Sequence, residues 1–227
     1  MMSDLDIYGR ELATDLQELI RGVLPTQRAV TNVGTRSKSS VRPGARKVSA
    51  VPLLCQGRRV GSLQFNFELE LDSVGRHPAV VSSKVHVLTH ATNRPVLRYE
   101  YVREANSHPQ AHWHVHGQST ELGRLLTGKK RKADALEKIH LPVGGPRFRP
   151  SLEDVLQMLV SDVGVDARPG WNRVIEDSRI RWRERQTRVV VRDHPEIAVG
   201  ELRSMGYMID ESKSTVPHAG RRRLLAY

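Results

Sequence analysis

Apolar and polar residues alternate with a period of two along residues 63–72, LQFNFELELD. The Leu and Phe side chains of this stretch share one face of an extended chain, and the Gln, Asn, Glu and Asp side chains share the other. The same alternation recurs in 83–91, 95–104 and 111–117, and the apolar stretch 51–57 precedes it. Turn-like segments separate these stretches. We therefore expect an antiparallel β-meander of about five strands with one buried face and one polar face.

Helical spacing of apolar residues flanks the predicted meander on both sides. Residues 4–24 carry apolar side chains three or four positions apart, with Ser3 as N-cap and Pro25 just past the end. After the meander, 171–193 is a long amphipathic candidate and 195–207 a short one. The sequence thus predicts the α+β class, with an N-terminal helix, a central antiparallel sheet and C-terminal helices.

A third helical segment, 151–164, begins directly after the meander and its irregular continuation. Ser151 is its expected N-cap and Asp154 stands at the third helical position, the spacing of a capping box. Gly164 is expected to end it. The stripe expected to be buried consists of Leu152, Val155, Leu156, Leu159, Val160 and Val163.

Residues 28–50 show neither helical nor strand periodicity. The segment is punctuated by Ser, Gly and Pro and is rich in Arg and Lys, which predicts a flexible basic linker. This prediction divides the chain into an amphipathic helix (1–27), the linker (28–50), an α+β core domain (51–165) and an Arg-rich helical extension (166–227).

The charge balance points to polyanionic partners. The chain of 227 residues has 36 Lys and Arg against 25 Asp and Glu, a formal net charge of +11 and a pI of about 10.3. Such a surface attracts nucleic acid. No apolar run is long enough to span a membrane, the N-terminus lacks the apolar core of a secretory signal, and Cys55 is the only cysteine. These features predict a cytoplasmic, bacterial protein without disulfides.

Histidines are concentrated in one short run. Four of the ten lie in 108–117, HPQAHWHVHG. A period of two places His112, His114 and His116 on one side of a strand, opposite Trp113. A polar outer face of a half-exposed sheet with no chemical role would show the same pattern, and so would a catalytic or metal-binding face.

Neighbouring strands add further groups to the histidine side. If Trp113 faces the core, Arg98 and Glu100 of the preceding strand share the histidine face, about 5 Å across. Acids, bases and a guanidinium together suit phosphoryl chemistry. We expect Glu100 or His114 to act as the base. His112 or His116 would be the acid and Arg98 the phosphate clamp.

Metal binding is an alternative use of the same histidines. Zinc accepts imidazole ligands, and two histidines two residues apart on a strand can share one ion. His86, His108 or Glu100 could complete the ligand set. The leading hypothesis needs no cofactor. The alternative is zinc held through His112, His114 and His116.

Two resemblances bear on function. HWHVHGQ resembles the histidine-triad motif of nucleotide hydrolases and transferases, which implies His114 as nucleophile with His112 and His116 beside it. Residues 51–165 are similar to TumE-type toxins of bacterial toxin–antitoxin modules. The similarity rests on LRYEY, the histidine segment and FRPSLEDVLQMLVSDV, with Glu100 where an Asp is typical. This second resemblance implies a toxin activity directed at nucleic acid or translation, and an antitoxin protein as partner.

These lines together predict a nucleic-acid-directed enzyme, namely a metal-independent, toxin-like ribonuclease, with RNA preferred to DNA. The alternatives are a non-catalytic nucleic-acid-binding or accessory protein and a zinc-dependent hydrolase. Basic residues of the long C-terminal helix and of two loops are the expected nucleic-acid contacts. They are Arg179, Arg181, Arg183, Arg185, Arg188, Lys129, Lys130, Arg131, Lys132 and Arg147.

Overall fold

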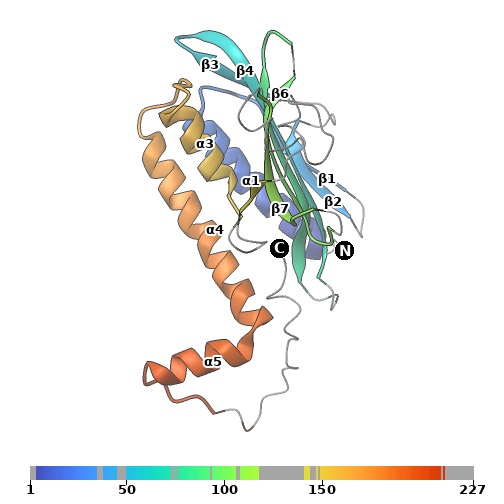
Figure 1. Cartoon of the computed structure of the whole chain (residues 1–227), viewed down its shortest axis with the longest axis vertical. Helices are drawn as coiled ribbons and strands as arrows, with labels where there is room; N and C mark the ends of the chain where they lie inside the picture. The colour runs from blue at the N-terminus through green and yellow to red at the C-terminus, as the bar shows by residue number, and fades with distance from the viewer. Residues whose placement is uncertain are drawn as a thin grey trace, which may run out of the picture.

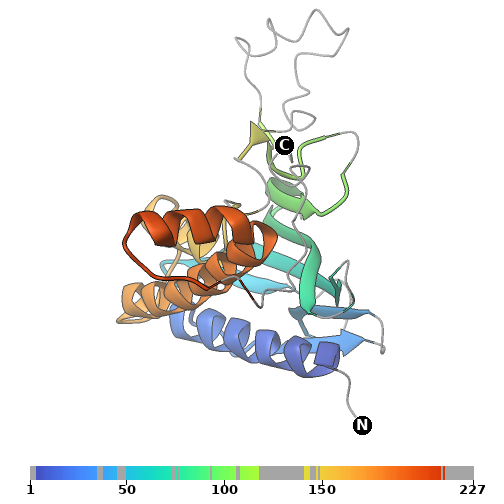
Figure 2. The same cartoon turned by 90° about the horizontal axis from the view of Figure 1, so that it is seen from below.

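A single antiparallel sheet with helices packed on one face forms the body of the protein (Figures 1 and 2). The computed structural model describes residues 4–34, 38–44, 50–72, 75, 77–92, 94–105, 108–117, 141–143, 147, 149–210 and 212. Its elements are α1 (Asp4–Val23), β1 (Val30–Gly34), β2 (Ser39–Pro43), β3 (Val51–Cys55), β4 (Arg58–Leu71), β5 (Pro78–Thr89), β6 (Pro95–Val102), β7 (Ala111–Val115), β8 (Leu141–Pro142), α3 (Leu152–Ser161), α4 (Trp171–Asp193) and α5 (Pro195–Ser204).

The α+β class and the antiparallel meander are confirmed, but the sheet is larger than expected. In the described chain it has eight strands in the order β1-β2-β4-β5-β6-β7-β8, with β3 also paired to β4. All pairings are antiparallel. The five predicted strands correspond to β3 through β7. The prediction of about five strands was too low mainly because β1 and β2 lie in the segment interpreted as a linker.

The prediction of a flexible linker at 28–50 is wrong for its described residues. Strands β1 and β2 form a hairpin, and β2 continues the sheet through pairing with β4, where Val41 lies opposite Phe67. The buried apolar side chains of the hairpin are those of Val30, Val41 and Pro43, so the alternation is too weak to stand out. The hairpin packs against α1 at Gly9, where an added Cβ would lie 2.7 Å from side-chain atoms of Asn32 and Ser39.

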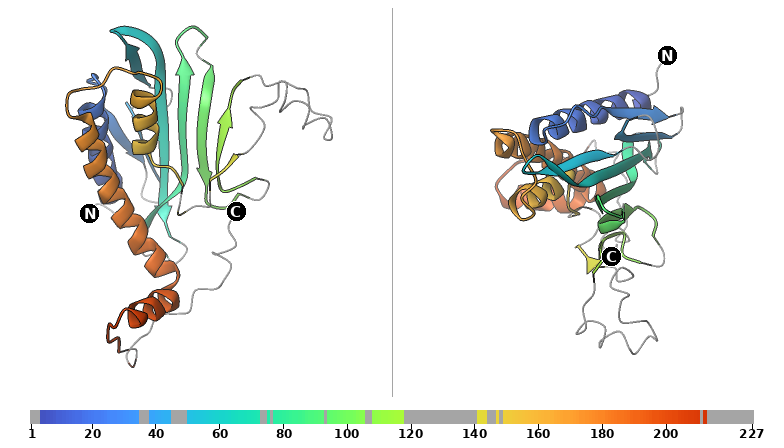
Figure 3. Two further views of the ribbon diagram at one scale, coloured as in Figure 1. Left: turned by 60° about the vertical axis from the view of Figure 1, so that its left-hand side comes forward. Right: turned by 90° about the horizontal axis from the view of Figure 1, so that it is seen from above.

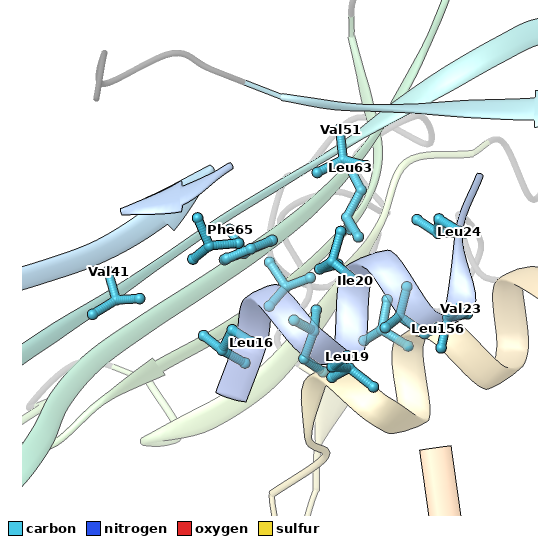
Figure 4. Close-up of a cluster of buried hydrophobic side chains, with 14 of the residues drawn as sticks. Leu16, Leu19, Ile20, Val23, Leu24, Val41, Val51, Leu63, Phe65 and Leu156 are labelled. Atoms are coloured by element: carbon cyan, nitrogen blue, oxygen red, sulfur yellow. The ribbon is translucent and has the colours of Figure 1, made fainter. Parts of the chain in front are cut away.

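The core lies between the sheet and the helices. The apolar sets of the alternating strands face α1 and α3, and the polar sets face away. Figure 4 shows Leu16, Ile20 and Val23 of α1 interdigitating with sheet residues and with Leu156 of α3. Helix α1 thus supplies one complete apolar stripe, as its helical spacing predicts.

Helix α3 begins as predicted and ends early. The Ser151 backbone N–H and hydroxyl both donate to an Asp154 carboxylate oxygen, at 2.8 and 3.1 Å. The helix stops at Ser161, and Gly164 follows with φ +78°, a left-handed conformation that glycine adopts without strain. Val163 is therefore outside the helix and 53% exposed, so its predicted place in the buried stripe is wrong.

Helix α4 spans the predicted residues 171–193 and packs against α1 and α3. The first helix and the C-terminal segment are also joined by polar contacts. The Arg168 N–H donates to the carbonyl of Val23 at 2.9 Å, and Arg185 pairs with Asp15. Helix α5 packs on the end of α4, away from the sheet (Figure 1). No helix in the described part of the chain is long and apolar enough to cross a membrane.

Candidate functional site

The register of three strands gathers the histidine-side residues on the face opposite the helices. Tyr99 and Trp113 lie opposite each other in β6 and β7, and their rings are 5.2 Å apart on the core side. The alternate residues therefore point the other way. On that face Arg98 lies opposite His114, and Glu100 lies opposite His112. The described helices pack on the other face, so the burial of His112 and His114 does not come from them. Figure 3 shows β7 toward the end of the sheet away from α4.

Glu100 is at the centre of this polar group. Its Oε1 lies 3.3 Å from Nε2 of His86 and 3.8 Å from Nη1 of Arg98. The hydrogen bond from His86 is the main cause that lowers the pKa of Glu100 to about 2, against the opposing effect of burial, and the Arg98 charge adds to it. Glu100 is therefore a carboxylate at any pH near neutrality.

His112 is held in one tautomer by the backbone. Its Nδ1 lies 2.8 Å from the carbonyl oxygen of Pro109. A carbonyl only accepts, so Nδ1 carries the proton and Nε2 is the nitrogen of the ring that has a lone pair. His112 is 1% exposed, and this burial lowers its pKa, so the ring is neutral at pH 7. Its ring contacts those of His108 and His114, with centroids 4.6 and 4.8 Å away.

Glu100, His112 and His114 form a group that could hold a metal ion. One ligand atom from each residue lies within 4.8 Å of the others. Tetrahedral zinc with bonds of about 2.0–2.1 Å needs ligand atoms about 3.3 Å apart, so the ligand atoms would have to approach one another by at most about 1.5 Å. Their chemistry fits zinc well. One ligand is anionic, and a backbone carbonyl fixes the His112 tautomer, the usual outer support of a metal-bound imidazole.

His116 is not part of this group among the described residues. The predicted zinc set was His112, His114 and His116, with Glu100 as one possible further ligand, and the structure groups Glu100 with His112 and His114. Strand β7 ends at Val115, and a residue four positions along a strand is about 13 Å away. A residue opposite on the neighbouring strand is only about 5 Å away.

The predicted basic contacts are separated from the histidines. Arg179 pairs with Asp154 and Arg185 with Asp15, so both tie α4 to the rest of the fold. Arg147 contacts the buried carboxylate of Asp193 at 2.6 Å. Exposed guanidinium groups on α4 belong to Arg181, Arg183 and Arg188. Lys129, Lys130, Arg131 and Lys132 lie outside the described residues.

Helix α4 and the histidine cluster lie on opposite sides of the sheet, so they do not form one continuous site. Two groups escaped the sequence prediction of the site. The Pro109 carbonyl could not be predicted, because every residue has a backbone carbonyl and the residue type does not show which one accepts a hydrogen bond from His112. Arg149 and the cavity beside it, on the helix side, were also missed. Its burial depends on residues that lie far away in the sequence.

Comparison with known proteins adds no assignment, because no family model, no curated protein and no solved structure matches the chain.

Proposed function

We propose that the polar face of β5, β6 and β7 is the active site of a nucleic-acid-directed phosphodiesterase, a toxin-like ribonuclease in which Glu100, His112 and His114 hold a zinc ion. The proposal rests on the proximity of these three groups, since one possible ligand atom of each lies within 4.8 Å of the others. Two hydrolase mechanisms were open from the sequence, one without a metal and one with zinc. The ionised Glu100 and the neutral His112 favour zinc.

Glu100 is a poor general base. A base works best with a pKa near the operating pH, whereas the pKa of Glu100 is lowered to about 2. At neutral pH such a carboxylate has little tendency to take a proton from a 2′-hydroxyl or from water. It is well suited to contribute a permanent negative charge to a cation site. The role of base expected for Glu100 is therefore replaced by that of a ligand.

His112 is suited to the same role. Its buried, neutral ring with Nδ1 bound to Pro109 needs no deprotonation before Nε2 coordinates a metal. His114, 6% exposed, lies beside it. A zinc ion held by these groups would polarise a phosphoryl oxygen and lower the pKa of a bound water.

Substrate charge is met by cationic groups beside the cluster. Arg98 lies next to Glu100, and its guanidinium can orient a phosphodiester. Lys84, opposite Glu100 on β5, is exposed on the same face. The net charge of +11 raises the local concentration of nucleic acid around the whole molecule. If the protein is a toxin, a small antitoxin protein is its expected partner.

The test combines metal analysis with cleavage. Purified protein is analysed for bound zinc, then incubated with total RNA and with single-stranded DNA, with and without EDTA. We expect about one zinc per chain and RNA cleavage that EDTA stops and added zinc restores. His114→Ala should lose both metal and cleavage. His90→Ala, at an exposed histidine outside the cluster, is the matched control and should lose neither.

Other outcomes separate the alternatives. Cleavage that survives EDTA but is lost in His114→Ala would overturn the zinc assignment and restore the metal-independent ribonuclease. Retention of nucleic acid without cleavage, equal in wild type and His114→Ala, would leave a binding protein. The exposed Arg181, Arg183 and Arg188 of α4 specifically favour this second candidate function.

A further inference from the structure

A small cavity lies on the helix side of the sheet, away from the histidine cluster. Residues of α1, of β4 to β6, of the segment 149–153 and of α4 line it. Its volume is about 40 Å³. Since one water needs about 10–15 Å³ on this measure, the space admits about three small groups.

An unsatisfied donor borders this cavity. The Tyr99 hydroxyl is buried in a residue that is 2% exposed, and it has no hydrogen-bond partner among the described residues. A buried polar group without a partner is costly and uncommon in native proteins. Burial raises the pKa of the Tyr99 phenol far above its usual range, so the group stays a neutral donor. It therefore lacks an acceptor.

A buried cation borders the same cavity. Arg149 is 7% exposed, and its guanidinium carbon lies 4.1 Å from the centre of the Tyr101 ring and 5.2 Å from that of Trp182. These rings hold the guanidinium by cation–π contacts. Arg149 and Tyr99 both line this cavity, and the Arg149 charge acts on the Tyr99 phenol. The cation and the hydrogen-bond donor therefore border the same space.

The acidic residues of the lining are already engaged. Asp15 pairs with Arg185, and Glu153 accepts a hydrogen bond of 2.6 Å from Ser178. Leu12, Leu16 and Phe67 supply apolar wall. The cavity therefore combines a cation, a hydroxyl that can donate a hydrogen bond, and apolar side chains.

We propose that this cavity binds the carboxylate of a small organic acid, with one oxygen accepting from the Tyr99 hydroxyl and the charge facing the Arg149 guanidinium. Two further arginines line the cavity: Arg185 is paired with Asp15, and Arg181 is exposed to solvent. A monoanion therefore matches Arg149, the buried arginine of the lining, and one neutral donor. A phosphate or sulfate dianion would bring a second negative charge close to Asp15 and Glu153, and it would have to be desolvated against apolar walls. The inference is independent of the proposed phosphodiesterase activity.

The test titrates the full-length protein with formate, acetate and propionate at constant ionic strength, with sulfate and inorganic phosphate as comparison anions. Trp182 borders the cavity, so tryptophan fluorescence reports binding, and a thermal-shift series provides a second readout. We expect saturable binding of at least one carboxylate, and binding of sulfate and phosphate at least about tenfold weaker. His114→Ala should bind the carboxylate as the wild type does.

The decisive variant is Tyr99→Phe, which removes only the unpartnered oxygen and so should fold. It should weaken carboxylate binding about tenfold or more, as expected for a lost hydrogen bond to a charged group. Tyr101→Phe is the matched control, because its ring contacts Arg149 but does not line the cavity, and its affinity should stay within about twofold. Absence of saturable binding by all three acids, equal affinity in Tyr99→Phe, or equal binding of sulfate or phosphate would overturn the proposal.

Discussion

A negative charge is partly buried on one face of strand β6, and a positive charge is buried against the other face. On one face, Glu100 is surrounded by cationic and imidazole groups that keep it ionised. On the other face, Arg149 lies against the rings of Tyr101 and Trp182, beside the unpartnered hydroxyl of Tyr99. Successive residues of one strand thus contribute to two distinct environments less than a sheet thickness apart.

This difference shows how neighbours decide what a buried ion can bind. A carboxylate stabilised by hydrogen bonds, with the neutral ring of His112 beside it, attracts a cation. A guanidinium stabilised by aromatic faces keeps its charge while its surroundings stay apolar, which suits an anion with an apolar body. Alternation along β6 keeps these two environments separate, because Tyr99 faces one side while Arg98 and Glu100 face the other.

The largest effect is expected from the apolar face. Leu156→Ala removes a fully buried side chain from the core and should lower the free energy of unfolding by about 2–5 kcal/mol, measured by urea denaturation. Zinc binding by the folded protein should be unchanged. Val163→Ala, at an exposed apolar residue after the same helix, should change the free energy by less than about 0.5 kcal/mol. Equal losses in the two variants would contradict the described core.

On the polar face, Glu100→Gln should change how stability depends on pH. The folded-state pKa of Glu100 is lowered from 4.5 to about 2, so its stabilisation is complete above pH 4.5 and is lost as the pH falls toward 2. Wild type should lose about 1–3 kcal/mol more than the variant over this range, in urea titrations at several pH values. Glu104→Gln, at an exposed carboxylate beyond the end of β6, should behave like the wild type. Parallel curves for Glu100→Gln and wild type would show that the His86 contact does not hold Glu100 ionised.

His112 should also make the protein less stable as the pH falls, but by a smaller amount than Glu100. Its pKa is lowered from 6.5 by burial, so the folded protein binds fewer protons than the unfolded chain below that pH. Its contribution to stability is complete above pH 6.5 and decreases as the pH falls toward the folded-state pKa. The NMR titration of its ring should have a midpoint below that of the urea-unfolded protein, and bound zinc should abolish the titration. A midpoint at or above 6.5 in the metal-free protein would contradict the buried, neutral ring.

The smallest change in stability is expected on the outer surface of α4. Substitution of Arg181, Arg183 and Arg188 together by Gln should alter the free energy of unfolding by less than about 0.5 kcal/mol in total. Retention of RNA should weaken. The slope of the logarithm of the binding constant against the logarithm of salt concentration should become less steep by up to about 3, if each arginine contacts one phosphate. Cleavage of a short oligonucleotide should persist, since the histidine cluster lies across the sheet. Loss of cleavage in this variant would show that the α4 arginines and the histidine cluster act as one site.

The sequence predicts strands with strong alternation and misses strands held mainly by their neighbours. Strands β4 to β7 follow from the alternation in 63–72 and later stretches, and α4 from its helical spacing. The β1–β2 hairpin has two buried valines, so its position depends on pairing with β4 and packing on α1. The carbonyl of Pro109 and the burial of Arg149 arise only when distant segments meet. Of the three further ligands that the sequence offered, Glu100 is the one that lies with His112 and His114.

The contact between α1 and α4 has a consequence for biosynthesis. Asp15 and Arg185 are 170 residues apart, and Arg168 bonds to Leu24 across 144 residues. At about 5–20 residues per second, the ribosome needs about ten to thirty seconds to deliver the second partner after the first. Until then, part of the α1 surface has no α4 to cover it. The surface of α1 that α4 covers in the folded protein therefore stays without that cover through most of the chain's own translation.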